Sequence, residues 1–538
     1  MTDTVRRLPR SGCAVLMGIL LIVVGTIALA YNLSGFLGFS FVRLARGALS
    51  WFGTYWPALL IAWGLYKIYV RLRHPESSYV GAAEVVILAW IVLLGLAVRS
   101  GERILGDMSI NMTLDDIASV VGPELFGPAH HFTERRSYAL EMAEVLVIEN
   151  DRGEVTVSGW DEEGLEVVIT RRVYDFSKAE AQALADELDL LFTVDLGRAR
   201  LRTSRPEGSR PVFTDLEIRV PKRMRVNVLN GRGAIRLKNL EGAVEASTSH
   251  ARVEAENLTG GVTVETSHAP IRLERITGRA EARNRNGAVV ATSIDGDLLV
   301  ETRNGSVSAE GVSGSATLRT RHASVHATDV GGPVEVQAHD AEVSVERAHQ
   351  GVSITTRNRP VFVSDVEGEL TLETRNSSVI ARLIRGDVVI ENQYRHIRLT
   401  DIGGGVRIDG PQCEVDLESV AGPIVIESSD KDVRVADFAS GLEIRSTHAR
   451  LHVSTERLAG AVHLETTYGD IELWLPSNAS ATLTATTRDG EMSSELGKLE
   501  ESSVNDHGRH WTATLGDGAH PVSISTSYGD IALRKAPR

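Results

Sequence analysis

Residues 296–313 read GDLLVETRNGSVSAEGVS, and units of this kind follow one another from about Gly242 to Leu475. Within the unit, apolar or small residues alternate with polar ones in two short runs, which an Asn-Gly pair separates. Such alternation on either side of a turn predicts two short β-strands in each unit. The inward positions expected for this unit are Leu298, Val300, Thr302, Val307, Ala309 and Val312.

A glycine marks the start of each unit, at intervals close to eighteen residues. A fixed period of this length indicates that the units stack, because one unit alone cannot bury its apolar face. We therefore predict a mainly β fold, a single-stack β-solenoid with about 18 residues per coil. The marker glycines are Gly242, Gly260, Gly278, Gly296, Gly314, Gly332, Gly351, Gly368, Gly386, Gly404, Gly422, Gly441 and Gly460.

The expected interior is thin, because the inward residues are mostly Val, Ala, Thr, Leu and Ile. Aromatic residues are rare between Leu240 and Ala461, where only Phe362, Tyr394 and Phe438 occur. Large rings would overpack so narrow a coil at a cost of about 1–3 kcal/mol each. Successive coils should lie roughly 4.8 Å apart, the spacing of neighbouring strands in a sheet.

A second repeated row lies in the turn between the two strands, eight residues after the marker glycine. Asn, Asp and His tolerate a left-handed backbone well, so this row predicts a stacked ladder of turn residues. A metal-binding strip is the alternative, but zinc needs three or four ligands within about 2.0–2.3 Å, and neighbouring coils are too far apart. The row comprises His250, His268, Asn286, Asn304, His322, Asp340, Asn376, Asp430 and Tyr468.

One position before this row, Arg285, Arg303, Arg321 and Arg375 form a basic stripe. Guanidinium groups in line could bind the carboxylates or phosphates of a polymer, so these four residues are the candidate ligand strip. The alternative is pairing between strands, because acidic residues lie two positions earlier on the same outward-facing side. These acidic residues are Glu265, Glu301 and Glu373.

The amino-terminal hundred residues differ sharply in composition. Three apolar segments, Ala14 to Tyr31, Tyr55 to Tyr66 with its flanks, and Val80 to Val98, approach the roughly twenty residues that span a bilayer. Trp and Tyr residues cluster around the second segment, as they do at membrane interfaces. We therefore predict three transmembrane α-helices before the solenoid. The distribution of Arg and Lys favours a cytoplasmic amino terminus, with the solenoid on the extracytoplasmic side of the cell (inner) membrane.

The sequence thus divides into five parts. We expect a membrane domain at 1–100, a linker at 101–144, an amino-terminal β region with a helical cap at 145–240, the regular solenoid at 241–475, and a carboxyl-terminal β cap at 476–538. The helical cap is predicted over Ser177 to Phe192, where apolar residues follow helical spacing. At the far end, Thr467 to Ile471 recurs as Ser527 to Ile531, so the chain should close on another copy of the same strand.

Two regions resemble known families. The entry strand Val147 to Trp160, the Ile218-Arg219-Val220-Pro221 segment, the Asn-Gly repeats and the closing Thr526 to Leu533 are similar to the bacterial "putative adhesin" family of β-strand-repeat proteins. Residues from Gly18 to about Val70, with Trp56-Pro57, resemble the LiaF-like transmembrane region. The adhesin resemblance implies extracytoplasmic binding and supplies no catalytic residues.

Catalytic and cofactor motifs are missing from the sequence: it contains no His-Glu-x-x-His, Cys-x-x-Cys, Gly-x-Ser-x-Gly or Gly-x4-Gly-Lys-Ser/Thr pattern. We therefore expect no enzyme activity, no cofactor and no metal. The two cysteines, Cys13 and Cys413, are not expected to form a disulfide. A net charge of −14 argues against nucleic acid as a partner.

The favoured function is a non-enzymatic, membrane-anchored binding or envelope scaffold module. Its expected partners are the membrane, as an integral protein, and a cell-envelope or surface polymer. Two alternatives stay open: an envelope-stress regulator or a structural protein that self-associates by stacking rods, and a glycan-active enzyme. Coils near their minimum length disfavour the enzyme, because no long loop is available to enclose a substrate.

Overall fold

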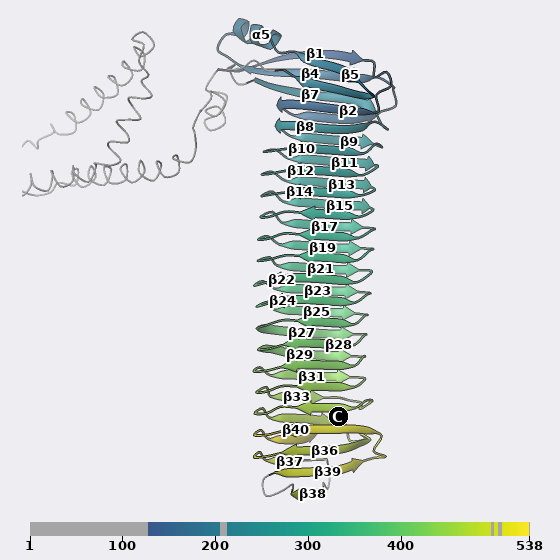
Figure 1. The fold of residues 1–538 in the computed structure, drawn as a ribbon, viewed down its shortest axis with the longest axis vertical. Helices are drawn as coiled ribbons and strands as arrows, with labels where there is room; N and C mark the ends of the chain where they lie inside the picture. Colours follow the sequence, from purple (N-terminus) through teal and green to yellow (C-terminus); the bar gives the residue numbers. More distant parts are fainter. Residues whose placement is uncertain (1–126, 205–211, 497–499, 504–507, 537–538) are drawn as a thin grey trace, which may run out of the picture. The chain divides into compact units, whose positions relative to one another are not determined.

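The computed structural model describes residues 127–204, 212–496, 500–503 and 508–536. The chain divides into two compact units, 1–113 and 114–538, and the first lies outside the described residues. In the second unit, short strands stack coil upon coil into two long sheets, A and B (Figure 1). The predicted single-stack β-solenoid is therefore confirmed for this unit.

Each regular coil contributes one strand to sheet B and the next strand to sheet A. The sheet B strands are β8 (Arg225–Arg232), β10 (Val244–Thr248), β12 (Val262–Thr266), β14 (Ala280–Asn284), β16 (Leu298–Glu301), β18 (Ala316–Arg319), β20 (Val334–Gln337), β22 (Val352–Arg357), β24 (Leu370–Arg375), β26 (Val388–Glu391), β28 (Val406–Gly410), β30 (Ile424–Ser428), β32 (Leu442–Arg445) and β34 (Val462–Glu465). The sheet A strands are β9 (Ile235–Leu240), β11 (Val253–Thr259), β13 (Ile271–Thr277), β15 (Val289–Asp295), β17 (Val307–Val312), β19 (Val325–Val330), β21 (Val343–Ala348), β23 (Val361–Val366), β25 (Val379–Ile384), β27 (Arg395–Ile402), β29 (Cys413–Val420), β31 (Val433–Phe438), β33 (Leu451–Ser454) and β35 (Ile471–Leu475).

Residues eighteen positions apart in the sequence are paired between neighbouring strands of each sheet. Parallel pairing joins Val262 to Ala280 in sheet B and Ile271 to Val289 in sheet A, each eighteen residues further along the chain. The alternating inward residues are almost completely buried between the sheets. Of the three aromatic residues expected to be scarce inside, Phe438 is buried, whereas Phe362 and Tyr394 are 37% and 40% exposed. One of the three aromatic rings thus lies inside the narrow interior, and the other two lie on the outer surface.

A left-handed residue interrupts each sheet A strand from β9 to β31 near its end. This residue explains the three-residue step between inward positions such as Ala255 and Leu258. Asn257, between them, has φ of 56° and is skipped in the pairing with the next coil. The same position has positive φ in twelve successive coils, at Asn239, Asn257, Arg275, Ser293, Gly311, Asp329, Arg347, Asp365, Leu383, Asp401, Ser419 and Asp437. The predicted left-handed row in the turn is therefore largely misplaced: of its nine residues, only Asn376 has positive φ.

The marker glycines lie where the corners of successive coils come closest. A Cβ on Gly332 would stand 2.6 Å from the backbone carbonyl of Gly314 in the preceding coil. No real side chain tolerates that distance, so the period of glycine reflects the stacking of corner on corner. Gly351 is one residue out of step with this series, and a Cβ there would find its nearest atom at 3.4 Å.

At the amino-terminal end, β2 (Val145–Arg152) and β3 (Val155–Trp160) form the first coil and pair directly with β8 and β9. Strand β1, which precedes the first coil, and the chain between β3 and β8 form an outer layer. It includes antiparallel pairs of β1 with β4, β4 with β7, and β5 with β6. This layer breaks the parallel repeat and covers the first coil. Its strands are β1 (Ala129–Tyr138), β4 (Leu165–Tyr174), β5 (Leu190–Asp195), β6 (Arg198–Thr203) and β7 (Val212–Pro221).

The helical cap is shorter than its sequence pattern suggested. Helix α5 spans Lys178–Asp186, begins at the Ser177 cap and buries Ala181 and Ala185. Leu188 is buried beyond the helix, and Leu191 lies in β5 with 48% of its surface exposed. The apolar residues of the predicted helix therefore lie partly in α5 and partly in β5, because β5 pairs with β6 from Leu190 onward.

At the carboxyl-terminal end, the last coil is inserted between two earlier ones. Strands β40 (His520–Thr526) and β41 (Ile531–Lys535) pair with β34 and β35 on one side and with β36 (Ala481–Thr487) and β37 (Met492–Ser494) on the other. Beyond β36 lie β39 (Arg509–Leu515) and β38 (Glu500–Ser503), both in antiparallel pairings. The expected second copy of the strand thus stacks directly on the first.

The prediction of three transmembrane helices in the fold needs correction. No helix of the described residues is long and apolar enough to cross a membrane. The only helix among them, α5, has nine residues and spans about 14 Å, compared with roughly 30 Å of bilayer hydrocarbon. The three segments from Ala14 to Tyr31, Tyr55 to Tyr66 and Val80 to Val98 lie outside the described residues.

Candidate functional site

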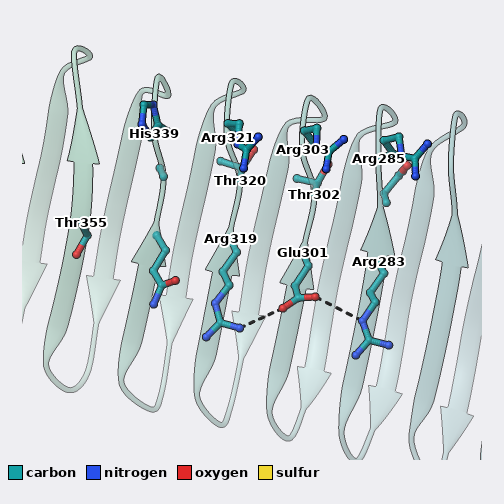
Figure 2. Close-up of a pocket in the computed structure, with 13 residues that line it drawn as sticks. Arg283, Arg285, Glu301, Thr302, Arg303, Arg319, Thr320, Arg321, His339 and Thr355 are labelled. Atoms are coloured by element: carbon teal, nitrogen blue, oxygen red, sulfur yellow. Dashed lines mark hydrogen bonds and ion pairs between the residues drawn. The ribbon is translucent and has the colours of Figure 1, made fainter.

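The structure brings three of the four predicted arginines together. Arg285, Arg303 and Arg321 follow strands β14, β16 and β18, at the first positions of the turn toward sheet A. Backbone hydrogen bonds join their coils, with the amide of Arg321 donating to the carbonyl of Arg303 over 3.2 Å. All three side chains are exposed and project side by side (Figure 2).

Arg375 stands in the same row, three coils beyond Arg321, where it pairs with Arg357. Arg357 was missed by counting from the glycines, because Gly351 is displaced by one residue in the series. Aligning the coils by their strand pairing instead places Arg357 in this row. The complete row is Arg285, Arg303, Arg321, His339, Arg357 and Arg375, on six consecutive coils, and all six residues are exposed.

Beside this row runs an open groove of about 680 Å³. It crosses five successive coils, from Arg283 to Thr355, and takes its lining from sheet B and from the adjoining turns (Figure 2). Five arginines and one glutamate contribute charge to it: Arg283, Arg285, Arg303, Arg319, Arg321 and Glu301. The groove is therefore basic, although the chain as a whole carries a net charge of −14.

Pairing between strands occurs within the groove, but it does not involve the predicted strip. Glu301 bridges Arg319 at 3.1 Å and Arg283 at 3.4 Å, its neighbours in the adjoining sheet B strands (Figure 2). Among the described residues, no carboxylate lies within ion-pair distance of Arg285, Arg303 or Arg321. The only acidic side chain lining the groove is thus already neutralised, and three guanidinium groups stay available.

Buried polar side chains hold the turns that carry the arginines. The amide of Asn284 donates to the carbonyl of Ala269 over 2.8 Å, and the hydroxyl of Thr356 donates to the carbonyl of Ala341 over 3.3 Å. Each bond reaches fifteen residues back, to the turn of the preceding coil. The sequence suggested only small inward residues here, whereas the structure shows hydrogen bonds that fix the turns and so preorganise the row.

The turn row next to the arginines is a stacked ladder, as expected. The amide of Asn304 donates to the side-chain oxygen of Asn286 over 2.8 Å, and the rings of His250 and His268 stack at 4.8 Å. Near the carboxyl-terminal end, Tyr468 stacks on His448 at 4.8 Å and on Tyr528 at 5.0 Å. No group of three or more His, Cys, Asp or Glu in the described part of the chain is arranged to hold a metal ion.

The groove holds groups that bind anions and lacks a pair suited to acid–base chemistry. Arginine stays protonated at every physiological pH, so it binds carboxylates and phosphates without transferring a proton. At the edge of the groove, hydrogen bonds from Asn358 and His339 hold the pKa of Asp340 below its ordinary value. That carboxylate is consequently ionised and poorly suited to act as an acid. The arrangement supports binding of an anionic ligand.

Comparison with solved structures finds two similar proteins at very low identity. A "putative cell adhesion protein" from Clostridium sporogenes is 8% identical, with 76% of this chain and 100% of that chain covered and a TM-score of 0.16. A "putative adhesin" from Bacteroides fragilis is 9% identical, with 75% and 97% covered and a TM-score of 0.15. Such scores are too low to support an argument about function.

No curated protein matches the chain. The match to a protein family covers residues 361–534, which extend from β23 to β41. It does not include the LiaF-like region suggested by the sequence, which lies outside the described residues and stays a prediction. The carboxyl-terminal part of the solenoid is thus similar to the family described as Toastrack DUF4097.

Proposed function

We propose that this protein is a non-enzymatic, adhesin-like binding module whose solenoid holds an anionic polymer of the cell envelope or cell surface. The observation that carries the proposal is the row of Arg285, Arg303 and Arg321, which lies in an open groove without carboxylate partners. Arginine is the residue best suited to bidentate contacts with carboxylate and phosphate groups.

Several features of the site support binding over turnover. The groove is open along its length, so it neither encloses a substrate nor excludes water from a reacting bond. Its ionisable side chains are arginines, one paired glutamate and His339. Glycoside hydrolysis usually needs two carboxyl groups that flank the bond, and this groove supplies only Glu301.

The test compares two charge-matched variants of the full-length chain, purified in a mild detergent. One variant replaces Arg285, Arg303 and Arg321 with Ala. The control replaces Arg272, Arg385 and Arg398, which are also exposed but form ion pairs elsewhere, with Ala. Polygalacturonate and poly(glycerol phosphate) serve as carboxylate and phosphodiester probes. We expect the groove variant to bind about a hundredfold more weakly than the control, because three charge contacts are lost.

Equal binding by the two variants would contradict the proposal, as would the absence of binding to both polymers. The same incubations test for turnover: new reducing ends released from polygalacturonate by the wild-type chain but not by the groove variant would identify a glycan-active enzyme instead. We expect none, because the groove has no second carboxyl group.

The ends of the solenoid favour binding along its side over growth by stacking. In both sheets at the amino-terminal end, and in sheet B at the carboxyl-terminal end, antiparallel strands replace the parallel eighteen-residue repeat. In sheet A at the carboxyl-terminal end, the last described strand is the three-residue β37, which pairs in parallel with β41. A second copy therefore meets at most this short strand as a continuation of the ladder. We further propose that the solenoid lies on the extracytoplasmic side; protease treatment of intact cells should then cleave it, and complete protection would contradict this location.

A further inference from the structure

The three arginines of the groove are stacked like on like. The pairing of β14, β16 and β18 places Arg285, Arg303 and Arg321 on adjacent coils, which lie roughly 4.8 Å apart. Like charges directly opposite on neighbouring strands destabilise a sheet. On sheet A an acid interrupts such a row, because Asp416 lies between Arg398 and Arg434. Arg357 and Arg375, further along the groove row, also pair without an acid between them. The unpaired stack therefore indicates that negative charge comes from outside the chain.

The groove also continues past the arginines toward the amino-terminal end. A second hollow of about 350 Å³ lies on the three preceding coils and uses the same strand-end positions, among them Ser249 and Ser267. These two serines occupy the row in which Arg285 comes next. The two hollows together cover eight successive coils, or about 34 Å along the axis of the solenoid. The two hollows follow each other along the solenoid. Hydroxyl groups and the carboxylate of Glu265 line the amino-terminal one, and guanidinium groups line the other.

A site of this outline fits a linear ligand better than a compact one. A single carboxylate or phosphate contacts one arginine, or two at most, so a small anion would leave the rest of the row unpaired. An extended chain with a negative group on each repeating unit would meet each guanidinium in turn. Its uncharged hydroxyl groups would meet Ser249 and Ser267, which accept or donate hydrogen bonds.

We propose that the groove binds a linear polyanion in an extended conformation, parallel to the solenoid axis, with one anionic group for each coil from Arg285 to Arg321. This inference rests on the proposed function and adds the class and orientation of the ligand. The anionic groups are carboxylates or phosphates, as in polyuronates or poly(glycerol phosphate). A second copy of this chain, which carries a net charge of −14, is the competing occupant.

Chain length is the variable that tests the orientation. Oligogalacturonates of one to about eight units, and glycerol phosphate oligomers of matching lengths, are titrated into the full-length chain in detergent. We expect affinity to rise about fivefold with each added anionic group up to three, and then more slowly as the flanking residues are reached. The two series show whether carboxylate or phosphate is preferred.

Two single variants locate the ends of the bound segment. Arg285→Ala and Arg321→Ala should each weaken binding of trimers and longer oligomers about fivefold. Dimers should lose less, because a dimer can move to the two arginines that are left. The matched control is Arg398→Ala, on sheet A, which should change neither series.

Binding of a monomer as tight as that of an eight-unit oligomer would overturn the inference while leaving an anion-binding function intact. Equal losses for dimers and long oligomers in both variants would also overturn it. If the wild-type chain instead dimerises in sedimentation experiments and Arg303→Ala abolishes the dimer, the groove holds a second copy. Failure of every polyanion to bind would remove the proposed function itself.

Discussion

Two rows of exposed arginines on this solenoid differ in the side chains that stack beside them. In the groove, Arg285, Arg303 and Arg321 succeed one another at eighteen-residue intervals without an acid between them. On sheet A, Arg398, Asp416 and Arg434 occupy the same kind of row, with the carboxylate 3.2 Å from Arg398 and 3.3 Å from Arg434. The residue eighteen positions away thus decides whether an arginine is neutralised or available.

The two rows differ in their expected contributions to the stability of the fold and to ligand binding. Opposite charges across neighbouring strands stabilise a sheet by about 0.2–1 kcal/mol, and like charges destabilise it by similar amounts. The sheet A row therefore contributes to the fold, whereas the groove row opposes it slightly. A surface that keeps such a cost on three successive coils has the character of a binding site, in line with the stability that functional sites commonly sacrifice.

The largest expected effect tests the coil spacing that both rows share. Gly332→Ala should lower the free energy of unfolding by about 3 kcal/mol, because the new Cβ would stand 2.6 Å from the backbone of Gly314. Urea unfolding of the full chain, followed by circular dichroism, measures the change. Gly351→Ala is the matched control, since its nearest atom lies at 3.4 Å. Equal losses in the two variants would show that corner contacts do not set the spacing.

A carboxylate placed in the groove should make its row behave like the row on sheet A. Arg303→Glu would lie between Arg285 and Arg321 and pair with both. We expect affinity for polygalacturonate to fall about tenfold or more, because one contact is lost and its neighbours are neutralised. Stability should rise by about 0.5 kcal/mol as repulsion is relieved. A variant that binds normally, or that loses stability, would contradict the comparison.

The converse change removes a charge from the sheet A row. Arg434 contacts Glu414 at 2.8 Å and Asp416 at 3.3 Å, so Arg434→Ala should lower the free energy of unfolding by about 0.5 kcal/mol. Binding of polygalacturonate should not change. Calorimetric unfolding and a binding titration on the same preparation check both expectations. Arg303→Ala is the matched variant, and a stability loss as large as that of Arg434→Ala would remove the distinction between the rows.

The smallest expected effect concerns pH. Partial burial alone would raise the pKa of Asp416, but hydrogen bonds from His396, Arg398 and Arg434 bring that pKa below its ordinary value of 3.8. A depressed pKa in the folded state contributes stability that is present above about pH 4 and is lost as the pH falls through the folded value. Asp416→Asn should therefore be less stable than wild type at pH 7, and the difference should vanish near pH 2.

Urea midpoints measured from pH 7 down to pH 2 test this dependence. Ser353→Ala, which changes an exposed side chain without a titrating group, is the control, and its difference from wild type should be the same at every pH. A difference between Asp416→Asn and wild type that is constant over the whole range would mean that the carboxylate charge does not contribute.

Sequence alone was enough for the eighteen-residue period, the two strands per coil, the thin interior and the arginine stripe, because each of these repeats at one fixed interval. In a parallel stack of coils, each residue lies beside the residue one period away in the sequence. A periodic sequence therefore predicts which residues are neighbours in adjacent coils, including the row that contains Arg285, Arg303 and Arg321.

Tertiary structure decided what does not repeat or what depends on backbone conformation. The left-handed position moved from the turn to residues such as Asn257, because the three-residue step of the inward side chains needs an extra residue inside the sheet A strand. Arg357 joined the row through strand pairing, although the glycine beside it is displaced. Glu301 pairs with Arg283 and Arg319, because side chains on the same face of neighbouring strands lie about 4.8 Å apart. The sequence offers several acids as partners for these arginines, and only the three-dimensional distances identify Glu301.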